Sequence, residues 1–221
     1  MVEPSAVLQA IGILLVAAVL LWFAFGTQSN IRKADHVMRW LQAGLPVLGP
    51  RTTLRWLGSS VAELKIVDAR APFRAAVAMI VLEPRDLSAL WALSRGRGRR
   101  DFLLLRCDLV RAPRIRADLI DPRAWTARDR RHDDAPFENE TTWTATSGAG
   151  ITVRSDRGVD LGPLRSFWER LDRGSGGAWR ISVRPLVPHV EVHLLFPALE
   201  SDARALLTTV RELAEAVAAP R

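Results

Sequence analysis

The sequence predicts an α+β protein in which a single N-terminal transmembrane helix precedes a mostly antiparallel sheet domain. Three observations predict it: an uncharged apolar run near the N-terminus, a later series of short strand-like runs, and two segments that share a helix-and-strand pattern. The composition agrees, because 48% hydrophobic and 25% charged residues are ordinary for a folded chain. Roughly 170–190 residues remain beyond the anchor, enough for one or two compact domains.

Residues 7–25 form the predicted anchor. They read VLQAIGILLVAAVLLWFAF, with Gln9 as the only polar side chain and no charge. At about 1.5 Å per residue the run spans roughly 28 Å, close to the hydrocarbon thickness of a bilayer. A cleaved secretory signal is the alternative, but the segment before the run holds Glu3 and no Lys or Arg, and the run is longer than a signal requires. We therefore expect a retained anchor.

Charges on the two sides of the anchor predict its orientation. The only charged side chain before it is Glu3, whereas Arg32, Lys33 and Arg39 follow it. The positive-inside rule then places the N-terminus outside and the C-terminal domain in the cytoplasm, as in a single-pass protein of the cell membrane. Indole rings suit the interfacial zone on the same side. The predicted membrane-interface residues are Trp22, Arg32, Lys33, Arg39 and Trp40.

Residues 29–50 predict a juxtamembrane amphipathic helix and linker. Asn30 is a suitable N-cap, and the apolar residues that follow it recur at helical spacing. Two interpretations stay open at this point. The helix lies on anionic lipid, with its basic residues among the headgroups, or it is a stalk packed onto its own domain.

Short strand-like runs alternate with helices from residue 52 onward. The predicted strand pairs are 61–67 with 73–82, 101–110 with 114–120, 142–146 with 151–154, and 179–184 with 189–196. The predicted helices are 86–94 with Asp86 as cap, a helix capped by Asp160, and 199–218. The apolar stripes of the first two helices, which include Trp91 and Trp168, are expected to face the core.

The order of elements in the first half recurs in the second. Residues 87–122 and 164–197 each begin with a Trp-containing helix, continue through an Arg-Gly-x-Gly loop and end in an alternating strand. This similarity predicts a duplicated ββαββ unit that forms one continuous antiparallel sheet with helices on one face. The expected organisation is an anchor (1–28), the juxtamembrane helix and linker (29–50), a first repeat (51–121), a polar linker (122–140) and a second repeat with a C-terminal helix (141–221).

The net charge of +7 is concentrated in residues 85–131, which hold 13 arginines against 6 acidic residues. A concentrated positive field attracts polyanions. Its densest part is the loop RGRGRR, because guanidinium groups bind phosphate bidentately and glycines let the backbone approach. The candidate polyanion-binding residues are Arg95, Arg97, Arg99 and Arg100. The alternative is a solvated turn, and the spacing is not that of a nucleotide-binding loop.

Other candidate chemistry is weaker. His189, Glu191 and His193 alternate on one strand, but histidines four residues apart on a strand are roughly 13 Å apart, too far to share a metal ion. We expect their side chains on the solvent face of a half-buried sheet, together with Arg114, Arg116 and Asp118. The cluster at 132–134, His-Asp-Asp, lies in the predicted linker. Cys107, the only cysteine, is expected to be buried, and it cannot form an internal disulfide.

These observations rank three functions. The first is a non-enzymatic, membrane-anchored cytoplasmic scaffold or partner-binding module, whose partners are membrane lipid and another membrane or cytoplasmic protein. The second is binding of a polyanion, anionic lipid or nucleic acid, through the arginine-rich region; no RNA- or DNA-binding motif accompanies it. The third is an uncharacterised enzyme. No cofactor or metal is predicted, since none of the common catalytic or cofactor motifs occurs.

Overall fold

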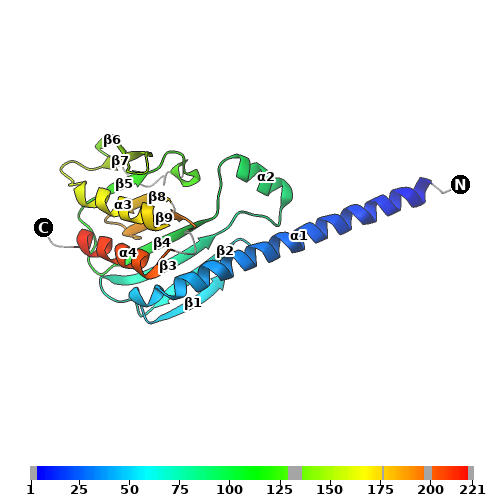
Figure 1. Cartoon of the computed structure of the whole chain (residues 1–221), viewed down its shortest axis with the longest axis horizontal. Coiled ribbons are helices and arrows are strands. Elements are labelled where there is room, and N and C mark those ends of the chain that lie inside the picture. The colour runs from blue at the N-terminus through cyan, green and yellow to red at the C-terminus, as the bar shows by residue number, and fades with distance from the viewer. Residues whose placement is uncertain (1–3, 129–135, 176, 197–200, 219–221) are drawn as a thin grey trace.

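The computed structural model describes residues 4–128, 136–175, 177–196 and 201–218. The described part folds into one nine-stranded antiparallel sheet with helices packed on it. The first helix projects from this body as a rod toward the N-terminus (Figure 1). The chain therefore has the α+β architecture and the long apolar N-terminal helix that its sequence predicts.

The described residues contain four α-helices and nine strands. The helices are α1 (Pro4–Gln42), α2 (Ser88–Gly96), α3 (Gly162–Ser175) and α4 (Ala203–Ala218). The strands are β1 (Arg51–Trp56), β2 (Val61–Val67), β3 (Phe73–Val81), β4 (Phe102–Leu109), β5 (Ala117–Ile120), β6 (Asn139–Thr144), β7 (Gly150–Ser155), β8 (Ala178–Val183) and β9 (Val190–Leu195). Short 3-10 helices are η1 (Leu45–Val47) and η2 (Trp125–Arg128). β1 is not among the predicted strands, because its largely exposed side chains give no pattern of burial.

The strands lie in the order β1-β2-β3-β4-β9-β8-β5-β7-β6, and each neighbouring pair is antiparallel. The pairing of β4 with β9 joins the two halves and sets Arg106 opposite Glu191. β5 crosses into the second half, where it lies between β8 and β7. One sheet thus passes through both halves of the chain, as predicted.

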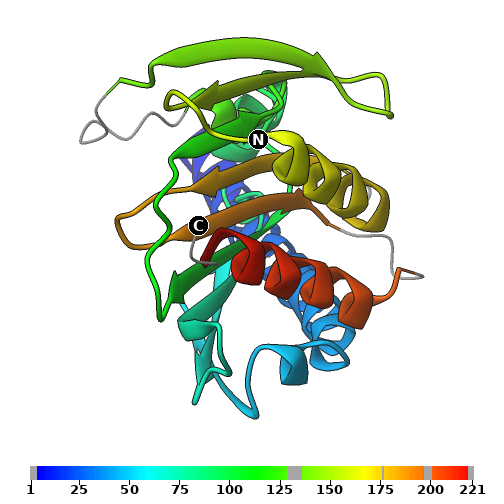
Figure 2. The same cartoon turned by 90° about the vertical axis from the view of Figure 1, so that its left-hand side faces the viewer.

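The main core lies on the sheet face that α1, α3 and α4 cover (Figure 2). Successive residues of a strand point to opposite faces, so Leu103 and Leu105 of β4 enter this core while Leu104 points away from it. Each of the three helices contributes buried apolar side chains, for example Leu41, Trp168 and Val210. A second, smaller cluster on the other face contains Phe102, Leu104, Ala124 and Trp179.

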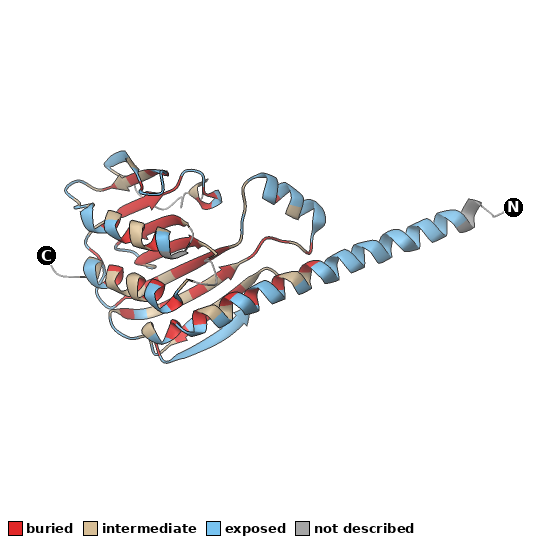
Figure 3. Ribbon diagram, in the orientation of Figure 1, coloured by how far each residue is buried: buried red, intermediate tan, exposed pale blue. Residues whose placement is uncertain are grey.

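α1 has two parts with opposite environments (Figure 3). Residues 7–25 are exposed on every side of the helix, although nearly all of them are apolar. Further along the same helix, Ala34, Val37 and Leu41 are buried in the core. The exposed part is long and apolar enough to cross a membrane, by length and composition. One continuous helix therefore connects a candidate membrane span to the centre of the folded domain.

The juxtamembrane segment is a stalk packed onto its own domain. It does not form a separate helix, because α1 runs through it to Gln42. The predicted apolar stripe is buried against the sheet and α4, so the alternative of a helix lying on lipid is wrong. Asn30, predicted as an N-cap, is instead a buried residue inside α1.

Two predictions, one about strand pairing and one about an internal duplication, are not confirmed. The predicted pair 101–110 with 114–120 does not form, because β9 takes the place beside β4. A short connection favours a hairpin, but an alternating pattern specifies only that a strand has a buried face. The duplication is not confirmed: β3 pairs directly with β4, whereas β5 separates β7 from β8. α3 packs on the sheet, and α2 contributes no residue to the described core.

Candidate membrane interface

The exposed part of α1 ends at Phe25, and the helix meets the domain at the next residue. A Cβ at Gly26 would lie 2.3 Å from the carbonyl oxygen of Arg85 and 2.5 Å from the Cα of Asp86. Only glycine permits this approach of two backbones. One turn earlier, Trp22 donates its Nε1–H to the same Arg85 oxygen at 3.0 Å. The segment before α2 is thus fastened to α1 where the apolar run ends.

A polar cluster fixes α1 to the domain one turn further on. We call Asn30, Lys33, Glu83, Arg85 and Asp101 the junction network. The buried amide of Asn30 donates to the Glu83 carbonyl oxygen at 3.1 Å and accepts from Arg85 Nη1 at 3.1 Å. Arg85 donates to both oxygens of Asp101 at 2.9 and 2.7 Å. Lys33 contacts the same carboxylate at 3.1 Å. The network therefore links one turn of α1, from Asn30 to Lys33, to the strand ends that flank α2.

The Asp101 carboxylate is the centre of this network. Burial alone would raise its pKa, but hydrogen bonds from Arg85 and from the Glu83 backbone N–H, together with the charges of Arg85 and Lys33, outweigh burial. The pKa of Asp101 therefore lies below its ordinary value. The carboxylate stays ionised at neutral pH and holds two cations from different elements in place.

α2 does not enter the core, although its stripe of Leu87, Leu90 and Trp91 was expected to face it. Leu87, Leu90 and Leu93 are 51%, 47% and 52% exposed, whereas Ser94 is buried (Figure 3). The expectation is wrong because the strands that flank α2, β3 and β4, are direct neighbours. Their connection passes around the end of the sheet toward α1 and does not cross the sheet face (Figure 1).

Trp91 was predicted to lie in the domain core. It lies instead at the junction of α1 with the domain, where it holds α2 in place. Its ring lies 6.3 Å from the ring of Trp22, and its Nε1–H donates to the Glu83 carboxylate at 2.6 Å. Arg95 contacts the same carboxylate at 3.1 Å and lies over the Trp91 ring. The Glu83 side chain is almost fully buried, so it requires these partners. Trp168, by contrast, is a core residue as predicted.

The four arginines of the predicted polyanion site do not converge on one point. Arg95 is engaged with the buried glutamate. Arg99 turns the other way, over the ring of Trp125 at 5.1 Å, and burial lowers the pKa of its guanidinium. Arg100 is exposed, and it donates to the carbonyl oxygens of Arg95 and Arg99. The exposed Arg97 side chain has no ionic or hydrogen-bonding partner among the described residues. Only Arg97 and Arg100 therefore present their charge mainly to solvent.

The predicted interface residues divide into two groups. Trp22, Arg32 and Lys33 lie near the junction, where Arg32 is exposed and Lys33 belongs to the junction network. Arg39 and Trp40 lie on the packed stalk, about 27 Å along α1 from Trp22 at 1.5 Å per residue. Trp40 is half-buried, and its Nε1–H donates to the Ser201 carbonyl oxygen. Of the five residues, Trp22 lies in the last turn of the apolar run, Arg32 and Lys33 lie about two turns past its end, and the other two lie further along α1.

The outer face of the sheet carries charged side chains that pair across strands. Arg106 of β4 contacts Glu191 of β9 at 2.9 Å, and Arg180 of β8 contacts Asp118 of β5 at 2.6 Å. The His193 Nε2 atom lies 2.8 Å from Glu191. The charges of this face are largely neutralised inside the protein, so they offer little net field to a partner.

The predicted solvent exposure of the His-x-Glu-x-His strand is wrong. His189, Glu191 and His193 are all buried, as is Asp118, because long neighbouring side chains and ion pairs cover them. Within the described ranges, no group of three or more His, Cys, Asp or Glu residues is arranged to hold a metal ion. The cluster at 132–134 lies outside the described residues. Cys107 is buried as predicted, and burial raises the pKa of its thiol to about 12.

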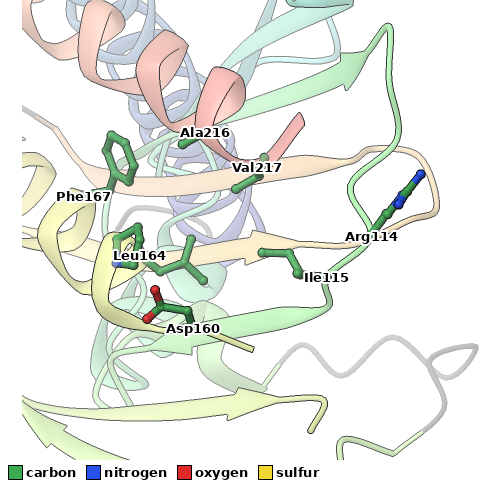
Figure 4. A pocket seen from close by; sticks show the side chains of 8 residues that line it. Arg114, Ile115, Asp160, Leu164, Phe167, Ala216 and Val217 are labelled. Atoms are coloured by element: carbon green, nitrogen blue, oxygen red, sulfur yellow. The ribbon is translucent and has the colours of Figure 1, made fainter. Parts of the chain in front are cut away.

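A cavity of about 200 Å³ lies between the end of α4 and the start of α3 (Figure 4). Its polar side chains are Arg114 and Asp160, which lie on opposite sides of it, and the rest of its lining is apolar. The two groups do not meet over a common point. This arrangement provides no nucleophile beside a base, which is the geometry that acid–base or covalent catalysis requires.

The junction network is the part of the site that sequence reasoning missed. A signal was present, because Asn30 lies on the same helix face as Ala34, Val37 and Leu41 at spacings of four, three and four. A polar residue on a buried stripe needs a buried partner. No known protein family matches the chain, and no curated protein matches it.

Proposed function

We propose that the chain is a membrane-anchored, non-enzymatic module that holds its sheet domain against the cytoplasmic surface of the cell membrane and binds another protein there. The continuity of α1 carries this proposal. One uninterrupted helix contains both the exposed apolar run and the segment buried in the core. A helical connection keeps a domain at a defined height and orientation, which a flexible linker cannot do.

The exposed run is unsuited to water. Residues 7–25 include thirteen large apolar side chains that are exposed, and burial of each in hydrocarbon is favourable by about 1.5–3 kcal/mol. Their sum far exceeds the net stability of a typical domain, about 5–15 kcal/mol. A bilayer removes this cost without any change in the domain. The size of this free energy supports a membrane span.

The charges near the junction support a cytoplasmic domain. Arg32 and Lys33 follow the span, and Arg97 and Arg100 lie at the same end of the domain. Basic side chains beside a span favour the cytoplasmic side. The acidic Glu3 is the only charge on the other side of the run.

The edges of the sheet are suitable surfaces for a protein partner. β1 and β6 are the outermost strands, and their side chains are exposed along almost their whole length. An edge strand offers unpaired backbone N–H and C=O groups to which a partner strand can bind. The outer sheet face is less suitable, because its charges are already paired across strands.

Membrane vesicles of known orientation test the anchor and its topology. We expect full-length protein to resist carbonate extraction, and a C-terminal tag to be digested only when protease reaches the cytoplasmic face. Release by carbonate, or digestion from the other face, would contradict the proposal.

Photo-crosslinking in intact cells tests the partner. A photoreactive residue at Thr53, on the edge strand β1, is expected to give a discrete crosslinked product. The matched control is Thr152, which also lies on a strand but between two neighbours in β7. Equal products, or none, at the two positions would argue against binding at this edge.

Binding of a polyanion is the second candidate. The observation that favours it is that Arg97 and Arg100 are both exposed, at and just after the C-terminal end of α2. The absence of a converging phosphate site among the described arginines makes it weaker than the first candidate.

A further inference from the structure

We infer that α2 is a second membrane-contacting element, an interfacial helix whose leucines enter the headgroup region and whose flanking arginines bind anionic phospholipid. The inference rests on the proposed membrane span and goes beyond it, because an anchor alone requires nothing of α2.

α2 is held beside the end of the apolar run. Trp22 bonds to the carbonyl oxygen of Arg85, Gly26 touches the backbone of Arg85 and Asp86, and the ring of Trp91 contacts that of Trp22. These contacts hold α2 beside the last turns of the apolar run. A bilayer that accommodates the run up to Phe25 therefore has its interface at the level of α2, where two indole rings already lie. Indole rings are enriched at that level of membrane proteins.

The surface of α2 exposes apolar side chains. A helix packed on a soluble domain buries its apolar stripe and exposes its polar residues. α2 is instead exposed over most of its surface: Leu90 and Leu93, and Leu87 just before its first residue, are half exposed, and Ser94 is its only buried residue. Leu90 and Leu93, three residues apart on the helix, lie close to one face, and Leu87 is the extended residue just before it; we call these three exposed leucines the apolar strip. None of them enters either described core cluster.

Positive charge lies next to the exposed leucines. The exposed arginines Arg97 and Arg100 follow the apolar strip directly, at the C-terminal end of α2. A long basic side chain keeps its charge among the headgroups while its stem lies along apolar surface. Leucines on one side and arginines beside them are the pattern of a helix that lies in the plane of an anionic membrane.

The occupant is lipid for a geometric reason. Trp91 of α2 lies against Trp22 of the span, so a bilayer that holds the span has its surface at the level of α2, within reach of the exposed leucines. A nucleic acid would match the arginines but not the leucines. A protein partner would have to occupy the space that the bilayer already takes.

Fluorescence of full-length protein in proteoliposomes tests the inference. The variants Leu90→Cys and Leu93→Cys carry an environment-sensitive dye, and Leu186→Cys is the control. Leu186 is 68% exposed in the turn between β8 and β9, at the end of the sheet opposite α2. The buried thiol of Cys107 does not compete for the dye. We expect a blue-shifted emission, and quenching by lipids that carry a quencher near the headgroup, at positions 90 and 93 only.

The charge is tested by lipid composition and by a matched pair of variants. Vesicles of phosphatidylcholine alone are compared with vesicles that also contain phosphatidylglycerol. Arg97→Gln with Arg100→Gln removes two charges beside α2, and Arg111→Gln with Arg114→Gln removes two exposed charges at the far end. An arginine near an anionic surface contributes about fivefold to binding. The first pair is therefore expected to shift insertion of α2 by an order of magnitude, and the second pair to have no effect.

Carbonate extraction of the same proteoliposomes separates this inference from the proposed function. If the protein resists extraction but dyes at 90 and 93 behave like the dye at 186, the inference is overturned and the anchor stands. If these dyes are shielded in cells yet aqueous in vesicles, a protein covers the strip and lipid does not, which also overturns it. Insertion that ignores phosphatidylglycerol and both arginine pairs would overturn the assignment of anionic headgroups.

Discussion

The substitution Gly26→Ala tests how α1 is joined to the domain. The new Cβ would lie 2.3 Å from the Arg85 carbonyl oxygen, 2.4 Å from its carbon and 2.5 Å from the Cα of Asp86. All three are backbone atoms, so no flexible side chain can move aside. Ordinary carbon contacts begin near 3.5 Å, and the two segments must therefore separate by roughly 1 Å.

The loss of stability can be estimated from the hydrogen bonds that this separation would break. The Trp22 bond to Arg85 is 3.0 Å long and the Asn30 bond to Glu83 is 3.1 Å, so both would exceed the normal range of hydrogen bonds. An unsatisfied buried polar group costs about 1–3 kcal/mol, and overpacking a similar amount. Alanine returns about 1 kcal/mol of helix propensity. We expect a net loss of about 2–4 kcal/mol in the free energy of unfolding.

Gly12→Ala is the matched control, since it makes the same change in the same helix at a position with no atom within 4 Å. Urea unfolding of both variants in detergent micelles should show destabilisation of Gly26→Ala and a control that is as stable as the wild type or more stable by up to about 1 kcal/mol. Trypsin should also cleave at Arg95 and Arg97 faster in Gly26→Ala, because α2 loses its attachment. A Gly26→Ala protein as stable as the control would refute the described contact between α1 and the domain.

Three further predictions concern buried ionisable groups. Because burial raises the pKa of Cys107 to about 12, maleimide labelling at pH 8 should be about a thousandfold slower in the folded protein than after unfolding, and rapid labelling of native protein would contradict the burial. Burial lowers the pKa of His189, whose Nδ1 accepts the Leu109 N–H, so its stabilising effect is present above about pH 6.5 and is lost as the pH falls. The unfolding free energy of the wild type should therefore decrease more between about pH 6.5 and 5 than that of His189→Gln, and parallel curves would disprove this. The pKa of Asp101 is lowered, so Asp101→Asn should destabilise the protein by about 1–3 kcal/mol at neutral pH, and the difference from the wild type should disappear as the pH falls below about 4; a constant difference would argue against an ionised Asp101.

Local patterns predicted most of the strands, because alternation with a period of two is a direct consequence of one buried face. The pairs 61–67 with 73–82 and 179–184 with 189–196 are found as β2 with β3 and β8 with β9. Pairing between distant strands has no local signal. β4 and β9 are more than eighty residues apart, and either one would bury its apolar face equally well beside a different neighbour.

The environment of the stalk could not be predicted from the sequence either. An apolar stripe with basic neighbours fits a lipid surface and a protein core alike, and the sequence left both interpretations open. In the structure, the environment of Asn30 distinguishes the two interpretations. A fully buried amide on that stripe has partners in Glu83 and Arg85, and a lipid surface would supply no such defined partners.

The same reasoning applied to α2 gives the opposite result, which is why its environment matters for function. Its stripe predicts burial, yet the domain leaves Leu87, Leu90 and Leu93 uncovered. A hydrophobic pattern states that a face avoids water, and it does not identify what covers the face. In the stalk the cover is the sheet; in α2 the chain provides no cover among its described residues and places the helix beside a candidate span. If the dyes at positions 90 and 93 prove shielded by lipid, the sequence pattern of α2 was correct about burial, and the bilayer supplies the missing layer.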